Sequence, residues 1–189
     1  MGVDIMGINP IHRSPKPESP DWNTATQEEK DTYFEVSDKW QEENPGHYFR
    51  SNWWGWRPIV TLADFANSTY NLNLDLSGWG SNSGDGLKSE YDCKIMADAL
   101  ENLLSESTQL ETDSDIIYLN LGTWVSDEGT FLSEEENEKL NEEYPFGTMF
   151  YSSIVDDGGK LVRTAHSASL SHIKRFISFL RECGGFEIW

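Results

Sequence analysis

The sequence predicts an α+β fold: a single domain in which a small mixed or antiparallel sheet is packed by about four to five helices. The chain has 189 residues, a length typical of one domain. Its elements are predicted in the order β, α, α, α, β, α, β, β, α, β, which favours a sheet with helices on one side. With 37% hydrophobic and 13% aromatic residues, the core is expected to be built on Trp, Phe and Tyr.

The first strand is predicted near the N-terminus, where Val3, Ile5 and Ile8 precede a proline-rich loop. Asp4 interrupts this apolar strand, and a carboxylate at such a position must be paired or hydrogen-bonded. Asp4 is therefore either a structural acceptor for loop amides or a group that binds a ligand.

Residues 11–46 are predicted to be an inserted loop and helix. Three prolines mark the loop, and Thr26 with Glu29 forms a capping-box pattern that predicts a helix over 27–44. The insertion serves either as an oligomer contact or as a lid, and the sequence leaves both interpretations open.

The segment 47–58 is the strongest candidate for a binding site. It holds three of the eight tryptophans and two of the fourteen basic residues. Rings supply stacking surface and arginines supply planar forks for phosphate or carboxylate, although a structural aromatic cluster with arginines packed on the rings is the alternative. The candidate ligand-binding residues of this segment are Tyr48, Arg50, Asn52, Trp53, Trp54, Trp56 and Arg57.

Two neighbouring features bear on this segment. Pro58 suits the first turn of a helix that runs to about Tyr70, so residues 54–57 are expected at a helix N-terminus, where anions are attracted. The next segment, 71–87, is loop-like and contains Asp85 as a further candidate ligand group. A turn capped by Asp85 that leads into the following helix is the alternative.

The remaining elements are predicted from periodicity, caps and turns. They are a helix over 88–106, a strand over 115–125, an acidic helix over 134–143, a hairpin with strands 149–155 and 160–164 and its turn at 156–159, a helix over 169–183 that is capped by Gly184, and a terminal strand over 186–189.

The chain is strongly acidic, because 33 acidic and 14 basic residues give a formal net charge of −19. Duplex DNA is expected to be repelled, whereas a small anion can bind where the few arginines converge. Alternatively, the acidic surface mimics DNA and occupies a DNA-binding protein. No secretory segment and no apolar run of about 20 residues is found, so a cytoplasmic protein without a membrane span is expected.

Motifs for catalysis or metal binding are not found in the sequence. The four histidines and two cysteines lack zinc-site spacing, and the Walker, EF-hand and Gly-x-Ser-x-Gly patterns are missing. We therefore predict no metal, no cofactor and no enzymatic activity. A carboxylate pair acting as acid and base stays open, because the spacing singles out no pair.

Four blocks of sequence carry a resemblance to a known family. They are the opening Met-Gly-Val-Asp-Ile-Met-Gly, the Tyr-Phe-Arg-Ser-Asn-x-Trp-x-Trp-Arg-Pro block at 48–58, Gly-Asp-Gly-Leu at 84–87 and Phe-Leu-Arg-Glu-Cys-Gly-Gly-Phe-Glu-Ile at 179–188. Through them the chain resembles a widespread family of small phage-encoded proteins. Residues 11–44 depart from the short form of that family, in which the tyrosine block follows soon after the opening.

The chain is also similar to the phage anti-CBASS sponges, which bind cyclic nucleotide signals without cleaving them. The resemblance implies a counter-defence protein that sequesters a cyclic di- or trinucleotide in the host cytoplasm. A symmetric ligand of this kind favours a homo-oligomer. An acidic protein–protein inhibitor and a small nucleotide-processing enzyme are the alternatives.

The candidate residues suit such a ligand. Indoles can stack on bases, guanidinium groups can hold phosphates, carboxylates can read guanine and a carboxamide can read adenine. These roles are assigned to Trp53, Trp54 or Trp56, to Arg50 and Arg57, to Asp4 or Asp85, and to Asn52, respectively.

Overall fold

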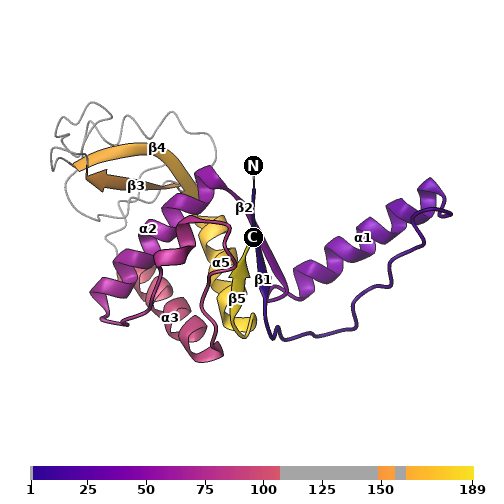
Figure 1. Cartoon of the computed structure of the whole chain (residues 1–189), viewed down its shortest axis with the longest axis horizontal. Helices are drawn as coiled ribbons and strands as arrows, with labels where there is room; N and C mark the ends of the chain where they lie inside the picture. The colour runs from indigo at the N-terminus through magenta and orange to yellow at the C-terminus, as the bar shows by residue number, and fades with distance from the viewer. Residues whose placement is uncertain (1, 107–148, 156–160) are drawn as a thin grey trace.

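The computed structural model describes residues 2–106, 149–155 and 161–189, and it shows the predicted α+β fold (Figure 1). The predicted strand over 115–125, helix over 134–143 and turn at 156–159 lie outside these residues. The described elements are β1 (Gly2–Gly7), α1 (Gln27–Glu43), β2 (Tyr48–Asn52), α2 (Trp53–Thr69), the 3₁₀ helix η1 (Ser77–Gly80), α3 (Glu90–Glu106), β3 (Met149–Val155), β4 (Leu161–Ser169), α5 (Leu170–Glu182) and β5 (Phe186–Ile188).

The principal sheet is antiparallel, with the strand order β2-β1-β5. Side chains alternate between its faces, as strand geometry requires. Val3, Ile5 and Phe49 are buried on one face. Asp4 and Arg50, which pair directly across β1 and β2, lie on the other face. One face of the sheet therefore packs against the core, and the other face presents polar side chains to solvent.

The core lies between the apolar sheet face and helices α2, α3 and α5. Its largest fully buried side chains are Trp and Phe rings. The Trp56 ring stacks on Trp79 with centroids 5.8 Å apart, and the edge of Phe176 meets Trp56 at 5.3 Å. An abundance of rings thus compensates for a modest aliphatic content.

Helix α2 begins earlier than predicted. The Asn52 side chain accepts the backbone N–H of Gly55 at 2.8 Å, and this N-cap starts the helix at Trp53. Pro58 therefore lies inside α2 and not in its first turn, which corrects the prediction. Residues 54–57 do lie near the helix N-terminus, as expected.

The C-terminal elements follow the prediction closely. α5 begins after Ser169, whose hydroxyl accepts the N–H of His172 at 3.2 Å. After the helix, Gly184 has φ +60°, a conformation that favours glycine. β3 and β4 form the predicted antiparallel hairpin, although β4 runs on to Ser169 because it pairs along the whole of β3.

Residues 11–46, here called the arm, leave the sheet after β1 and return to it at β2 (Figure 1). The capping box of α1 is confirmed, since Thr26 and Glu29 bond each other's backbone N–H. α1 projects away from the other helices, and Trp40 is its buried residue. Arg13 ties the base of the arm to the body through an ion pair with Glu182. No helix within residues 2–106 or 161–189 is long and apolar enough to cross a membrane.

Candidate functional site

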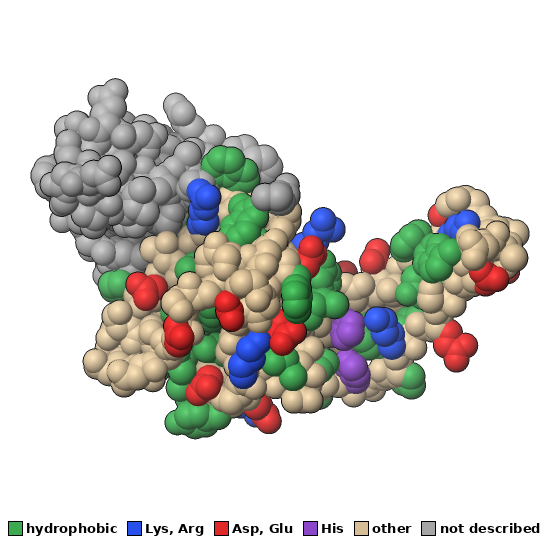
Figure 2. Space-filling view, in the orientation of Figure 1, with side chains coloured by type: hydrophobic (Ala, Val, Ile, Leu, Met, Phe, Trp, Pro, Cys, Tyr) green, Lys and Arg blue, Asp and Glu red, His purple; other side chains and the backbone are tan. Residues whose placement is uncertain are grey.

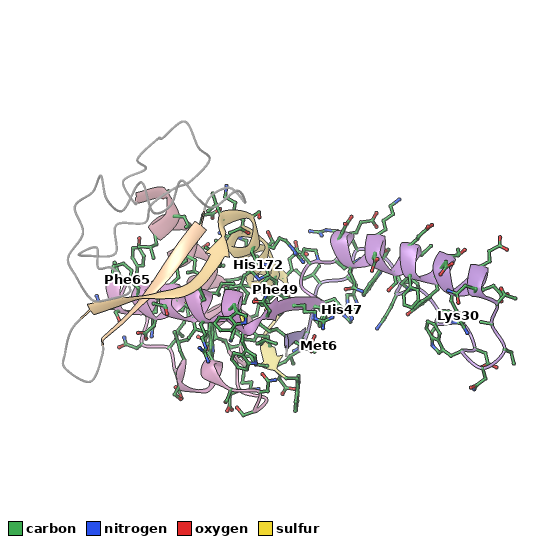
Figure 3. All side chains as sticks on the ribbon, turned by 90° about the horizontal axis from the view of Figure 1, so that it is seen from above. Met6, Lys30, His47, Phe49, Phe65 and His172 are labelled. Carbon is green, nitrogen blue, oxygen red and sulfur yellow. The ribbon has the colours of Figure 1, made fainter. Side chains whose placement is uncertain are left out.

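A hollow of about 600 Å³ lies between α1 and the polar face of the sheet. We call it the arm hollow. Met6 and His47 lie where the arm meets the body (Figure 3), and Figure 2 shows the histidines of the visible face gathered at the same place. The arm hollow is lined by Asp4, Met6, Lys16, Tyr33, Ser37, Trp40, Gln41, His47, Tyr48 and Trp189.

A polar group at one wall of the arm hollow is built by the register of β1 and β2. The Tyr48 hydroxyl donates to Asp4 Oδ1, and Arg50 Nε lies 3.7 Å from the same oxygen. Burial, with the hydrogen bond to Asp4, raises the pKa of Tyr48 to about 12. Asp4 is thus paired, as a carboxylate in a strand must be. Its Oδ2 has no hydrogen-bond partner among the described residues and can accept from a ligand.

Aromatic rings from distant parts of the sequence form the other walls. Tyr33 and Trp40 come from α1, and the Trp40 indole donates to the Ser14 carbonyl at 3.0 Å, which closes the arm loop onto the helix. Trp189 exchanges backbone hydrogen bonds of 2.7 and 2.8 Å with Asp4, and both residues line the hollow. The six-membered ring of Trp189 lies beside Gly84, and the residue is 54% exposed.

Two nitrogen groups complete the lining, Lys16 and His47. The His47 ring lies 4.8 Å from Trp40 and 5.4 Å from His12 between ring centroids. Burial lowers the pKa of His47, and the nearby positive charge of Lys16 lowers it further. These surroundings therefore favour the neutral form of His47. Its Nδ1 is buried and has no hydrogen-bond partner within the described part of the chain.

The structure brings together three of the residues predicted for the site: Asp4, Tyr48 and Arg50. It does not bring Asp85 to them. Asp85 packs beside η1, where it accepts from Ser83 at 2.5 Å, and its neighbour Gly84 bonds β5, the strand at the far edge of the sheet from β2.

The tryptophans of the 47–58 segment do not act as one cluster. Trp56 is fully buried and donates to the Trp79 carbonyl at 2.8 Å, so the prediction that it contacts a ligand is wrong for this conformation. Trp54 is 63% exposed and Trp53 is half-buried against the core. Successive helical residues point about 100° apart, so these indoles face different surroundings.

Two further predicted residues lie outside the arm hollow. The side-chain oxygen of Asn52 accepts the N-cap hydrogen bond of α2. Arg57 is exposed on α2 and does not line the hollow. The structure therefore gives neither residue a role in that cavity.

Sequence reasoning missed Lys16, Tyr33, Trp40, His47 and Trp189 as lining residues. One signal was present: Tyr33, Ser37 and Trp40 share a helix face at spacings of four and three residues. Nothing in the local sequence indicates that this face is turned toward β1 and the C-terminus.

A second polar contact lies in the interior. His172 Nε2 is 2.9 Å from Ser51 Oγ and joins α5 to β2. Burial, with the charge of Arg175, lowers the pKa of His172. Ser51 is 5% exposed, so the pair is a structural link across the core boundary. Among the described residues, no group of three or more His, Cys, Asp or Glu is placed to hold a metal ion.

No protein-family model, curated protein or solved structure matches the chain. Function is therefore inferred from the arm hollow and from the chemistry of the residues that line it.

Proposed function

We propose that this protein binds a nucleotide second messenger, a cyclic di- or trinucleotide, and sequesters it without cleaving it. The observation that carries the proposal is the arm hollow, where several aromatic rings meet a lysine and a carboxylate in an otherwise acidic molecule. Rings of this kind stack on bases, with about 1–3 kcal/mol per base.

Each part of such a ligand has a complementary group. Trp189 offers an exposed indole for a base, and Lys16 offers a positive charge for a phosphate. The free oxygen of Asp4 can accept the N–H groups of guanine, while Tyr48 holds the other oxygen in place. The resemblance to phage sponges supports a counter-defence role, in which the captured signal no longer reaches a host effector.

We propose binding in preference to turnover because the sequence carries no catalytic motif. A symmetric ligand shared between copies of the chain makes a homo-oligomer part of the same proposal. Native mass spectrometry after incubation with a nucleotide extract reports ligand mass, ligand integrity and the number of protomers together.

Calorimetric titration with cyclic dinucleotides tests the site. Trp189→Ala is expected to weaken binding about tenfold, because it removes one stacking surface. Trp54→Ala is the matched control, since that indole is exposed but lies outside the arm hollow. If only the Trp54 variant lost binding, the binding site would have to be assigned to the start of α2. Recovery of cleaved ligand after heating would argue for an enzyme.

A protein–protein inhibitor is the second candidate. The tip of the arm favours it, because Trp22 and Phe34 remain 45% and 52% exposed and pack on each other at 5.6 Å. α1 carries seven acidic and two basic residues, so the partner would be a basic protein surface. A complex that forms without nucleotide and is lost in Phe34→Ala would favour this candidate.

A further inference from the structure

We infer that the ligand extends from the arm hollow into a second, arginine-lined hollow, so that both hollows hold it at once. The inference rests on the proposed function. It adds Arg175 to the binding residues and gives the physical reason for preferring a dinucleotide to a mononucleotide.

The second hollow has a volume of about 690 Å³ and lies at the β2 edge, between α1 and α5. We call it the arginine hollow. Gln41 and Tyr48 line both hollows, so the two cavities meet at these side chains. The arginine hollow is lined by Asp38, Gln41, Glu42, Pro45, Tyr48, Phe49, Arg50, Arg175 and Ser178.

Its two arginines are available for an anion. The side chain of Arg50 is 69% exposed, and its Nε lies 3.7 Å from Asp4 Oδ1. The Arg175 guanidinium carbon stands 5.9 Å from the centroid of the Phe49 ring. In the described part of the chain, Arg175 forms no ion pair with a carboxylate. Two planar forks therefore share one cavity, which suits a phosphate.

The opposite wall limits how much negative charge the arginine hollow accepts. Asp38 and Glu42 lie one turn apart on α1 and line it across from the arginines. Their carboxylates can accept from ribose hydroxyls but repel further phosphates. The hollow thus fits a single phosphodiester flanked by sugars better than a terminal polyphosphate.

Joined cavities favour a long ligand over a short one. A mononucleotide fills one hollow, whereas a dinucleotide can place a base among the rings and a phosphate between the arginines at once. Once one nucleotide of the ligand is bound, the other is held close to the second hollow at a high effective concentration, so the whole ligand binds more tightly than either part alone. Because Tyr48 stands between the hollows, the hydrogen bond from its hydroxyl to Asp4 fixes the junction.

The test is a calorimetric comparison of cyclic di-AMP and cyclic di-GMP with AMP and GMP. The dinucleotides are expected to bind at least about tenfold more tightly than the matching mononucleotides. Arg175→Ala is expected to weaken dinucleotide binding more than mononucleotide binding, and so to abolish that preference. Lys174→Ala is the matched control, because it removes an adjacent exposed charge of α5 that does not line the hollow. Asp38→Asn is expected to strengthen dinucleotide binding.

Thermal melting confirms that each variant is folded, and Arg175→Lys, which keeps the charge but loses the fork, should weaken dinucleotide binding as well. Equal loss of mono- and dinucleotide affinity in Arg175→Ala, or the same loss in Lys174→Ala, would overturn the inference. So would a wild-type protein that binds both ligand lengths equally, although the proposed function would then stand. If the protein binds none of the four ligands, the proposed function fails for the nucleotides tested and the inference fails with it.

Discussion

Trp54 and Trp56 are two positions apart, yet one is 63% exposed and the other is fully buried. Trp56 fills the centre of the core against Trp79 and Phe176. We expect Trp56→Ala to lower the free energy of unfolding by about 3–5 kcal/mol, because it removes a large buried ring and leaves a cavity. Trp54→Ala is expected to change it by only about 0.5 kcal/mol. Urea denaturation of both variants measures the difference, and equal effects would contradict the burial assignment.

The sequence could predict part of the site at the residue scale. Asp4 was selected because a carboxylate in a strand must be paired, and Tyr48 and Arg50 were selected because rings and arginines mix in the segment 47–58. The strand β2 that carries Tyr48 and Arg50 was not predicted. Trp56 was misassigned because the exact start of α2 decides which of its indoles faces the core. That start is set by the N-cap hydrogen bond that Asn52 accepts, which composition does not reveal.

Tyr48 also gives a prediction for alkaline pH. Its pKa is raised to about 12 in the folded protein, mainly by burial, from an ordinary value near 10. The protonated phenol is thus favoured by the fold, so its stabilisation is complete below pH 10 and is lost as the pH rises from 10 to 12. When tyrosinate absorbance is followed against pH, Tyr48 should ionise near pH 12, and Tyr48→Phe should remove that step of the titration curve. A late step that persists in this variant would assign it to another tyrosine.

At the scale of elements, the contact between His172 and Ser51 links α5 to β2. The pKa of His172 is lowered from 6.5, chiefly by burial, so the fold favours the neutral ring. Its stabilisation is complete above pH 6.5 and is lost as the pH falls below that value, where the unfolded chain takes up the proton first. His172→Gln should therefore flatten the loss of stability as the pH falls below 6.5.

Urea denaturation at several pH values measures this slope, and Ser51→Ala is the control. That variant removes the hydrogen bond but keeps the imidazole, so it should lower stability while preserving the pH dependence. A His172→Gln variant with the slope of the wild type would assign the acid sensitivity to other groups.

Helices α1 and α5 have similar caps but different surroundings. Thr26→Ala removes the cap of α1, which is worth about 0.5–2 kcal/mol. Because α1 buries Trp40 alone, we expect faster hydrogen exchange in its first turn and little change in global unfolding. Ser169→Ala, at the cap of α5, should lower the global stability by about 1 kcal/mol, because α5 is packed into the core. Similar exchange patterns in both variants would show that α1 is coupled to the core.

Element identity was predictable where local rules act. The capping box of α1 and the apolar stripe of α3 are such cases. The arm hollow was not predictable, because it joins Lys16, Trp40 and Trp189 across almost the whole chain. These three residues meet because β1 pairs with both β2 and β5. No local sequence pattern indicates which strands will pair.

At the scale of the molecule, charge acts on folding and on binding in opposite directions. A net charge of −19 destabilises the compact state by self-repulsion, and Figure 2 shows acidic side chains on both the arm and the body. Salt shortens the screening length from about 10 Å at 0.1 M to about 3 Å at 1 M. Raising the salt concentration should therefore increase the midpoint of thermal unfolding, by roughly 2–4 °C for each kcal/mol regained.

The same screening weakens the attraction between a phosphate and Lys16, Arg50 or Arg175, so nucleotide affinity should fall as stability rises. Melting curves and titrations in the same series of NaCl concentrations separate the two effects, and an equal osmolarity of sucrose controls for excluded volume. In Arg175→Ala the decline of dinucleotide affinity with salt should be shallower. If affinity and stability rose together, screening of the repulsion between the acidic protein and its anionic ligand would outweigh the phosphate contacts assigned to the arginine hollow.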